Sequence, residues 1–530
     1  MINVIVTILE TIFHETKVSV ITAPTGSAAY NIGGATCHSL FGIDPMNPHK
    51  DLTEYKKDQL KPQFMHTLAL MMDERSMISC PVLGRTESNC KVLAHNGMNS
   101  NGTKPYGGIP IIFAAGDDGQ LGSVNVANRG RGAMYIFKED GTKDPAIYST
   151  SNTVRDPAWY INESHGADCF IQLAQNVVEF TKTHRVNKEQ KILSSILKNM
   201  REHGGVTDKE ADYLQKLNID NSEIKQTRQE WLKKEATWIF PSNAKVSEKN
   251  YTKIKELVHD ANPVCNLLGQ ITETTSNMKG RVSASHFHHE DLNPKRRHTT
   301  LCRGAKCAVD RNIFTACGVF NGAQVTVVEI RFKQNCNPNT GSEPEYVIVD
   351  CPSYTGPTWV EGHPTWIPIP VTETLCKFKC CKIRQVPLQL SFARTGQKFQ
   401  GQQVGPEHHI KAMVADIGSI LNEARNPGYT YMICSRVSTL GNGPMDSALY
   451  FSGSHTDKFR LTDMTNKRTG GGKYEGVRRK ETWTKFLNRR KEQTNLKISI
   501  QERSALKKWA TTTKITREEL EKIIVEHSDN

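Results

Sequence analysis

The feature that most constrains the fold is a short apolar segment that leads into a glycine-containing polar turn. It occurs twice in the first part of the chain, at residues 17–22 and 109–115, each bounded by Gly or Pro. Apolar runs of this length with these boundaries predict buried strands. Polar groups at the ends of buried strands are typical of an α/β sheet, whose functional residues gather at the strand ends. We therefore predict an α/β fold.

The character of the sequence changes along the chain. Residues 185–235 are rich in Lys, Glu, Leu and Ile at helical spacing and predict a helical insert. Residues 301–390 contain short β-branched and aromatic runs separated by Gly and Pro, which indicate a small β-barrel. After the glycines at 470–472 the sequence is basic, and we expect a helical tail.

Composition narrows the class of partner. The formal net charge of +13 favours a polyanion such as a nucleic acid. No uninterrupted apolar run is long enough to cross a bilayer. The 14 cysteines are scattered, which is typical of reduced thiols inside a cell. No C-x-x-C pair supports zinc binding, and we interpret residues 286–289 (His-Phe-His-His) as a solvated loop.

Three strand-end segments carry groups that can bind phosphate or metal. In residues 23–29, Gly26 lets the backbone approach a ligand, and the following amides can hold an anion. Asp73 at a strand end can hold Mg²⁺, and Glu74 can orient or deprotonate a water molecule. Gln120 follows the next strand and can sense a terminal phosphate. An ordinary turn or a surface carboxylate pair would explain each segment taken alone.

The order of these segments resembles motifs Ia, II and III of superfamily-one helicases. The closest likeness is to the RecD-like Pif family, whose versions read A-P-T-G-x-A-A, D-E-x-S-M and G-D-x-x-Q-L. Further segments resemble later parts of the family, including motifs V and VI. They lie at residues 173–185, 200–204, 304–323, 389–401 and 431–437. Because the series runs in family order over about residues 15–440, the chain is identified as similar to Pif-type ATP-dependent DNA helicases.

The resemblance implies two RecA-like domains with an ATP site in the cleft between them and an inserted SH3-like β-barrel. The expected first domain spans 1–165, and the second comprises 166–300 and 388–460. The expected barrel spans 301–387, and the basic tail spans 461–530.

The resemblance also implies roles for individual residues. The expected catalytic residues are Glu74, Gln120, Arg185 and Arg436. The residues expected to bind ATP and Mg²⁺ are Asp73, Arg185, Gly401 and Arg436, with Asp73 as the metal ligand. The residues expected to line the single-strand track are Thr25, Gly26, His38, Thr395, Lys398 and Gln400. The family moves 5′ to 3′ and acts at forks in repair, recombination, the response to DNA damage and telomere maintenance.

The sequence departs from the family at the missing P-loop and, more mildly, at Arg75, Gly122, Gln397 and Cys434. It contains no G-x-x-x-x-G-K-[ST] string, which in P-loop proteins cradles the phosphates, and residues 2–13 resemble the helix that follows that loop. Arg75 stands where an apolar residue is usual and can compete for Asp73.

Two explanations stay open: a truncated record of a working helicase, or a decayed copy such as a Helitron-like transposon helicase. We expect weak or no ATP hydrolysis by the printed chain. The alternative function is a catalytically dead module that binds single-stranded DNA. We expect a nuclear protein, although mitochondrial placement is equally compatible with a basic DNA-binding chain.

Overall fold

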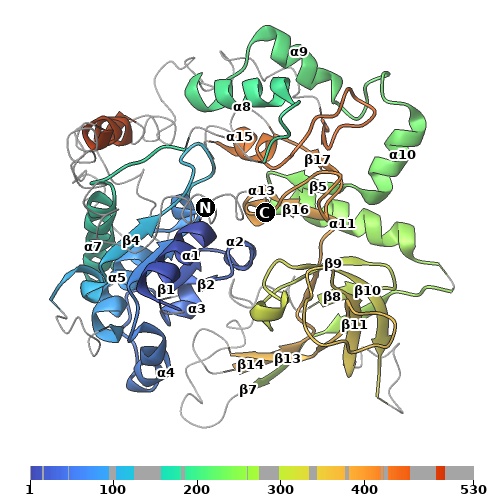
Figure 1. Cartoon of the computed structure of the whole chain (residues 1–530). Helices are drawn as coiled ribbons and strands as arrows, with labels where there is room; N and C mark the ends of the chain where they lie inside the picture. Colours follow the sequence, from blue (N-terminus) through green and yellow to red (C-terminus); the bar gives the residue numbers. More distant parts are fainter. Residues whose placement is uncertain are drawn as a thin grey trace. The chain divides into compact units, whose positions relative to one another are not determined.

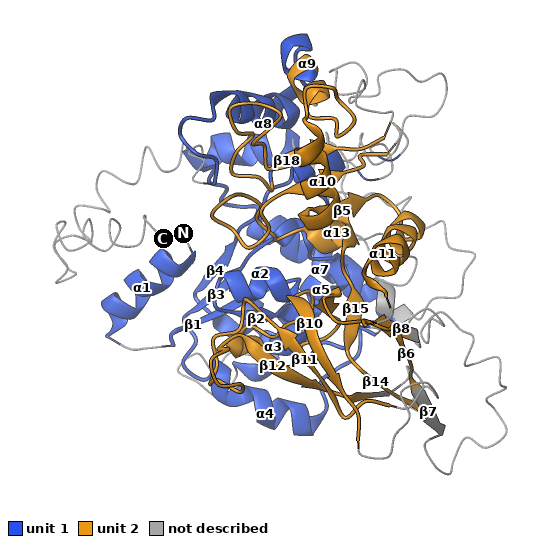
Figure 2. Ribbon diagram, turned by 90° about the vertical axis from the view of Figure 1, so that its right-hand side faces the viewer, with its two compact units in different colours: residues 1–211, 419–435, 457–530 blue, residues 212–418, 436–456 orange. Residues whose placement is uncertain are grey.

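The computed structural model describes residues 2–14, 17–45, 47–94, 103–123, 157–180, 185–203, 205–259, 261–273, 298–333, 343–375, 381–418, 422, 426, 428–453 and 485–495. The chain divides into two compact units, coloured separately in Figure 2. Unit 1 comprises residues 1–211, 419–435 and 457–530, and unit 2 comprises residues 212–418 and 436–456.

Unit 1 is built on a four-stranded parallel sheet in the order β2-β1-β3-β4. The strands are β1 (Ser19–Ala23), β2 (Ala35–Thr36), β3 (Ala69–Met72) and β4 (Ile111–Ala114). Every residue of β3 is buried, as expected of a central strand in a parallel sheet. The two strands predicted at 17–22 and 109–115 are confirmed as β1 and β4.

Helices cover this sheet on both faces, as the alternation of side chains along β3 requires. Ala69 and Met71 belong to an apolar cluster with Ile2 and Leu9 of α1 (Ile2–Phe13), which confirms the helix predicted for residues 2–13. Leu70 and Met72 belong to the main core of the unit, which contains residues of α3 (Cys37–Leu40), α5 (Cys80–Leu93) and α7 (Pro157–Leu173). Figure 1 shows α5 and α7 beside the sheet, with α4 (Glu54–Phe64) at its edge.

The remaining described helices of unit 1 come from distant parts of the sequence. They are α2 (Gly26–Asn31), α8 (Lys191–His203), α15 (Tyr429–Cys434) and a helix over residues 485–495. In this last helix Phe486 and Leu487 are buried in the main core of unit 1. The Thr494 hydroxyl accepts a hydrogen bond from the Val177 amide at 3.0 Å. The part of the predicted basic tail that the structure describes is therefore helical and packed.

Unit 2 contains a second parallel sheet, in the order β16-β5-β17-β18. Its strands are β5 (Thr237–Phe240), β16 (Ala393–Thr395), β17 (Met413–Ala415) and β18 (Leu449–Phe451). Its helices include α10 (Gln226–Glu235), α11 (Asn243–Leu257) and α13 (Gly396–Phe399). The helix α9 (Asp208–Lys216) crosses the boundary between the units. The helical character predicted for 185–235 is confirmed by α8, α9 and α10.

The rest of unit 2 is antiparallel. Five strands form a sheet in the order β12-β11-β10-β9-β15, namely β9 (Lys306–Val309), β10 (Gln324–Arg331), β11 (Tyr346–Asp350), β12 (Trp366–Pro370) and β15 (Leu388–Leu390). Smaller sheets join β7 (Gln270–Glu273), β14 (Cys381–Gln385) and β13 (Thr372–Leu375), and β6 (Cys265–Leu268) with β8 (His298–Leu301). The β-rich character predicted for 301–390 is confirmed, and its closure into an SH3-like barrel stays a prediction.

Two parallel sheets with helices make this an α/β protein, as predicted. The bounds of the compact units differ from those of the predicted domains, because residues 166–211 and 419–435, which were predicted in the second domain, group with unit 1. Among the described residues no helix has the length and apolar character needed to span a membrane. The histidine-rich segment 286–289 and most of the tail lie outside the described residues.

Candidate functional site

Asp73 and Glu74 lie where β3 ends, in a turn that hydrogen bonds fix to the strands on either side. The Asp73 amide donates to the Thr22 carbonyl of β1 at 2.9 Å, and the Arg75 amide donates to the Ala115 carbonyl after β4 at 2.9 Å. Glu74 has φ +48°, in the left-handed region that non-glycine residues rarely occupy. Backbone conformations of this kind persist where surrounding bonds over-determine them, and they cluster at functional sites.

The environment of Asp73 disfavours its negative charge. Burial raises the pKa of this carboxyl above its ordinary value, while the Glu74 backbone hydrogen bond and the Arg185 charge partly oppose the shift. A carboxylate oxygen held at a strand end and short of compensating charge is the kind of donor that Mg²⁺ prefers. The Asp73 oxygens are of the ligand type that Mg²⁺ takes, and the metal role of Asp73 stays a prediction.

Arg75 has a different partner from the one its sequence position suggested. Its guanidinium pairs with the Asp118 carboxylate at 2.5 Å, and both side chains are largely buried. The backbone explains this pairing, because Gly116 has no Cβ: one built there would lie 2.7 Å from Arg75 Cγ. The expectation that Arg75 competes for Asp73 is therefore wrong, because Arg75 pairs with Asp118. Arg185 is the arginine whose charge lowers the pKa of Asp73.

The loop after β4 is organised around Asp117. Its carboxylate accepts a hydrogen bond from the Gly119 amide at 2.9 Å and one from the Gln120 side-chain amide at 3.3 Å. Gln120 is buried at 6% exposure, and its Oε1 has no hydrogen-bond partner among the described residues. A buried amide oxygen left unpaired is costly unless something completes it. Gln120 is thus oriented by Asp117 with its acceptor unused.

Two distant residues complete the contacts of Asp117. The Tyr431 hydroxyl of α15 donates to its carboxylate at 2.7 Å, and the Arg201 guanidinium of α8 lies 3.9 Å away. Gly119 leaves room for the tyrosine ring, since a Cβ there would lie 2.8 Å from Tyr431 Cε1. Burial alone would raise the pKa of Asp117, but Arg201, Tyr431 and the loop hydrogen bonds hold it below its ordinary value.

Sequence reasoning did not find this group. Asp117, Tyr431 and Arg201 each lie inside a segment that was singled out, yet none was assigned a role. Tyr431 and Asp117 are 314 residues apart, and no spacing rule relates positions at such a distance.

Arg185 also lies in unit 1, and its positive charge influences the Asp73 carboxylate. Its Nη1 donates to the Ser435 carbonyl at 2.8 Å, and its charge acts on Asp73. Unit 1 therefore brings Asp73, Glu74, Gln120 and Arg185 to the edge of one parallel sheet and its flanking segments.

The predicted DNA-contacting residues of unit 1 follow β1 and β2. Thr25 caps α2, and its hydroxyl accepts a hydrogen bond from the Ala28 amide at 3.2 Å. Gly26 opens the helix, and His38 belongs to α3. These residues lie in the order that the sequence predicted, at the carboxyl ends of neighbouring parallel strands.

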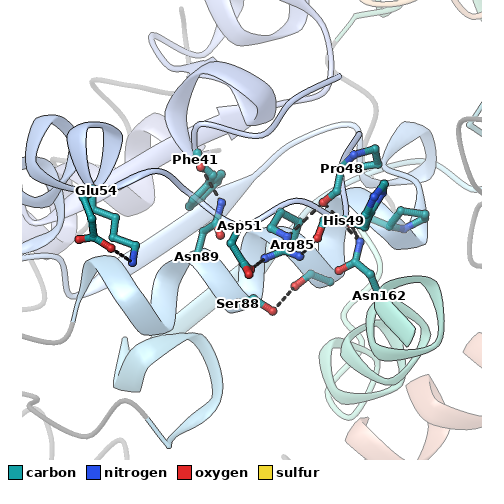
Figure 3. A network of polar contacts seen from close by, with 12 residues as sticks. Phe41, Pro48, His49, Asp51, Glu54, Arg85, Ser88, Asn89 and Asn162 are labelled. Atoms are coloured by element: carbon teal, nitrogen blue, oxygen red, sulfur yellow. Dashed lines mark hydrogen bonds and ion pairs between the residues drawn. The ribbon is translucent and has the colours of Figure 1, made fainter. Parts of the chain in front are cut away.

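The segment that follows His38 is tied to the helices beneath it (Figure 3). Arg85 of α5 is buried, donates to the Pro48 carbonyl at 3.1 Å, and also contacts the His49 carbonyl and Asp51. Asn89 donates to the Phe41 carbonyl at 2.8 Å. Because buried carbonyls need donors, these side chains fix the path of the chain after α3.

The remaining predicted residues belong to unit 2. Thr395 caps α13, and Lys398 Nζ donates to the Gln389 side chain at 2.9 Å. Gln400 is buried, and Gly401 has φ +85°, a conformation that favours glycine. Arg436 is fully buried, and its carbonyl accepts a hydrogen bond from the Val404 amide at 2.9 Å. The structure places each of them, and their roles stay predictions.

Comparison with known proteins gives three consistent results at the level of sequence. Residues 3–138 match the family model described as PIF1-like helicase. The ATP-dependent DNA helicase PIF1 of Emericella nidulans is 35% identical over 120 residues, which is 22% of this chain and 15% of that protein. PIF1 of Saccharomyces cerevisiae is 32% identical over 141 residues, 26% of this chain and 15% of that protein. The chain thus spans about a seventh of the length of these curated relatives (15%).

Solved structures show the likeness of the fold over most of the chain. The crystal structure of Pif1 helicase from Candida albicans covers 86% of this chain and 89% of its own, with a TM-score of 0.53 and 19% identity. A Bacteroides Pif1 helicase in complex with ADP-AlF3 and ssDNA covers 84% of each chain, with a TM-score of 0.51 and 20% identity. The two parallel sheets fit the RecA-like domains of such structures.

Proposed function

We propose that the chain is an ATP-dependent DNA helicase that moves 5′ to 3′, because residues 3–138 match the PIF1-like helicase family model. One observation carries the proposal: Asp73, Glu74 and the loop around Gln120 lie together at the carboxyl edge of a parallel sheet, within the segment that matches the family. Ligands of open α/β sheets bind at that edge.

The family resemblance assigns the nucleotide chemistry to individual residues. ATP supplies the phosphoanhydride and Mg²⁺ the charge that offsets the phosphates, and Asp73 would hold the metal. Glu74 would orient and deprotonate the attacking water, and its unusual backbone conformation supports a positioned rather than a mobile carboxylate. Gln120 would report the state of the terminal phosphate, and Arg185, Gly401 and Arg436 would contact the nucleotide.

The contacts of Asp117 support this assignment of Gln120. Asp117 fixes the Gln120 side chain and is itself held by helices α8 and α15. A change at Gln120 would therefore reach two helices through one carboxylate, which is the property a phosphate sensor needs.

The DNA contacts are proposed for single strands. Thr25, Gly26, His38, Thr395, Lys398 and Gln400 would hold backbone phosphates through amides, hydroxyls and lysine, with little reading of bases. A Bacteroides Pif1 has been solved bound to ssDNA, and another Pif1 structure concerns unwinding at forked dsDNA. By similarity, the partners of this chain would be single-stranded DNA and forks.

The wider roles rest on the family alone. We assign the chain to DNA repair, recombination and telomere maintenance, with a nuclear location or, as the alternative, a mitochondrial one. The same resemblance supports an SH3-like barrel over 301–387 and the RecA-like boundaries 1–165, 166–300 and 388–460.

Binding to single-stranded DNA tests the substrate class. Fluorescence anisotropy with a labelled oligothymidine should show affinity that falls steeply with salt, because released counterions drive binding. Lys398→Ala should weaken binding for all sequences alike and lower the salt slope by about 1. The matched control is Lys216→Ala, which removes an exposed lysine outside the proposed track and should change neither quantity. An absence of binding at low salt would contradict the proposal.

A further inference from the structure

Three metal-ligating side chains meet between α5 and α7, away from the strand ends. The Glu87 carboxylate, the His165 imidazole and the Cys169 thiol each offer a ligand atom, and these atoms all lie within 4.8 Å of one another. The His165 Nε2 lies 2.7 Å from Glu87 Oε2 and 3.8 Å from the Cys169 sulfur. Nothing in the proposed helicase chemistry uses this group.

The packing of the two helices creates the cluster. His165 and Cys169 are four residues apart on α7, so they share one face of that helix. Gly166 and Gly84 let the backbones touch: a Cβ on Gly166 would lie 1.7 Å from the Cys80 carbonyl oxygen, and one on Gly84 would lie 2.5 Å from the Asn162 carbonyl oxygen. The close approach brings Glu87 of α5 against the shared face of α7.

The two carboxylate oxygens of Glu87 have different partners. Lys91 Nζ lies 2.7 Å from Oε1, and the Tyr106 amide donates to the same oxygen at 3.1 Å. Oε2 is the oxygen that faces His165. One oxygen is thus already held by the donors that orient a ligating carboxylate, while the other points into the cluster. This division is the arrangement that a single-oxygen metal ligand requires.

We propose that Glu87 Oε2, His165 Nε2 and the Cys169 sulfur bind one Zn²⁺ ion, with water as the fourth ligand. Zinc takes carboxylate, imidazole and thiolate ligands together in tetrahedral geometry. Ligand atoms around such an ion lie about 3.3–3.7 Å apart. The sulfur-to-nitrogen distance of 3.8 Å lies just above this range, and the nitrogen-to-oxygen distance of 2.7 Å has to open by a fraction of an ångström.

A zinc ion can reach the cluster from solvent, and the proton that it displaces from Cys169 can leave. Glu87 and Cys169 are buried, whereas the His165 side chain is 36% exposed and leaves a route from solvent. Burial, the largest influence, raises the pKa of Cys169 to about 12, so the metal-free sulfur carries a proton. Zinc binding breaks that S–H bond, forms the Zn–S bond and releases the proton to solvent. No oxidant or reductant is involved.

The test measures zinc in the full chain, purified without a polyhistidine tag, stripped with a chelator and dialysed against zinc chloride. The wild type should retain one zinc ion that Cys169→Ser and His165→Gln lose, with affinity lowered by more than about 100-fold. The control Cys265→Ser, at a partly buried thiol outside the cluster, should keep the ion. Equal zinc content in the wild type and in both ligand variants would overturn the proposal, because other side chains would then hold the metal.

A second measurement does not depend on the folding of any variant. Cobalt added to the stripped wild type should give a thiolate-to-cobalt absorption band with the intensity of a tetrahedral site. The absence of that band in the wild type would overturn the proposal.

Discussion

At the scale of single residues, Asp117 connects the loop after β4 to Tyr431 of α15 and Arg201 of α8. We predict that Tyr431→Phe destabilises the protein by about 1–2 kcal/mol near neutral pH, because a hydrogen bond to a buried charged group is lost. Thermal or urea unfolding would measure it, with Tyr55→Phe as the control, since the Tyr55 side chain is exposed.

The same variant has a pH signature whose sign follows from Asp117. The native pKa of Asp117 lies below its ordinary value of 3.8, so its contribution to stability is complete above that value and is lost as pH falls through the lowered one. The gap between Tyr431→Phe and the wild type should therefore narrow on acidification. A gap that stays constant down to acid pH would contradict the ionised role of Asp117.

The pKa of Asp73 is shifted in the opposite direction to that of Asp117. Burial raises its native pKa above the ordinary value of 3.8, so its ionised form opposes folding at neutral pH when no metal is present. We predict that Asp73→Asn raises the melting temperature by about 1–3 °C in chelator at pH 7. The gain should vanish below the ordinary Asp value, where the carboxyl is protonated in both states.

Two comparisons sharpen the Asp73 prediction. Asp58→Asn, at an exposed position on α4, should leave the melting temperature almost unchanged. Added Mg²⁺ should stabilise the wild type and not Asp73→Asn, because only the carboxylate attracts the cation. A lower melting temperature for Asp73→Asn in chelator would be the contrary result.

At the scale of elements, Gly84 and Gly166 allow the close approach of α5 and α7. A methyl group at position 166 would collide with backbone atoms, which cannot rotate away as a side chain would. We predict that Gly166→Ala costs about 3 kcal/mol or more, at the upper end of overpacking effects. Gly443→Ala is the matched control, because a Cβ there meets nothing within 4 Å. Equal unfolding midpoints for the two variants would refute the close approach.

The elements also show where sequence reasoning succeeds. The strands β1 and β4 and the β-rich character of residues 301–390 were predicted from short runs bounded by Gly and Pro, and α1 from its likeness to a family helix. Each is specified by neighbours in sequence: period, turn residues and length. The partner of Arg75 was predicted wrongly because Gly116, which makes room for its side chain, lies on the next strand's loop.

The contacts that could not be predicted from the sequence are tertiary contacts between distant segments. The Asp117–Tyr431 bond and the cluster of Glu87, His165 and Cys169 join segments far apart in the chain. The helical spacing of His165 and Cys169 was present in the sequence, but the third ligand comes from another helix. Such sites emerge only once two helices are known to touch.

At the scale of the whole molecule, the central proposal is that the chain acts as the motor of a Pif1-type helicase. The most direct test is ATP hydrolysis stimulated by single-stranded DNA, measured on the printed chain and on a form with a relative's strand and G-x-x-x-x-G-K-[ST] segment joined ahead of Ile2. We predict background hydrolysis by the printed chain, DNA-stimulated hydrolysis by the extended form, and its loss in the extended form carrying Glu74→Gln. No stimulated hydrolysis in the extended form, or equal hydrolysis after Glu74→Gln, would contradict the claim.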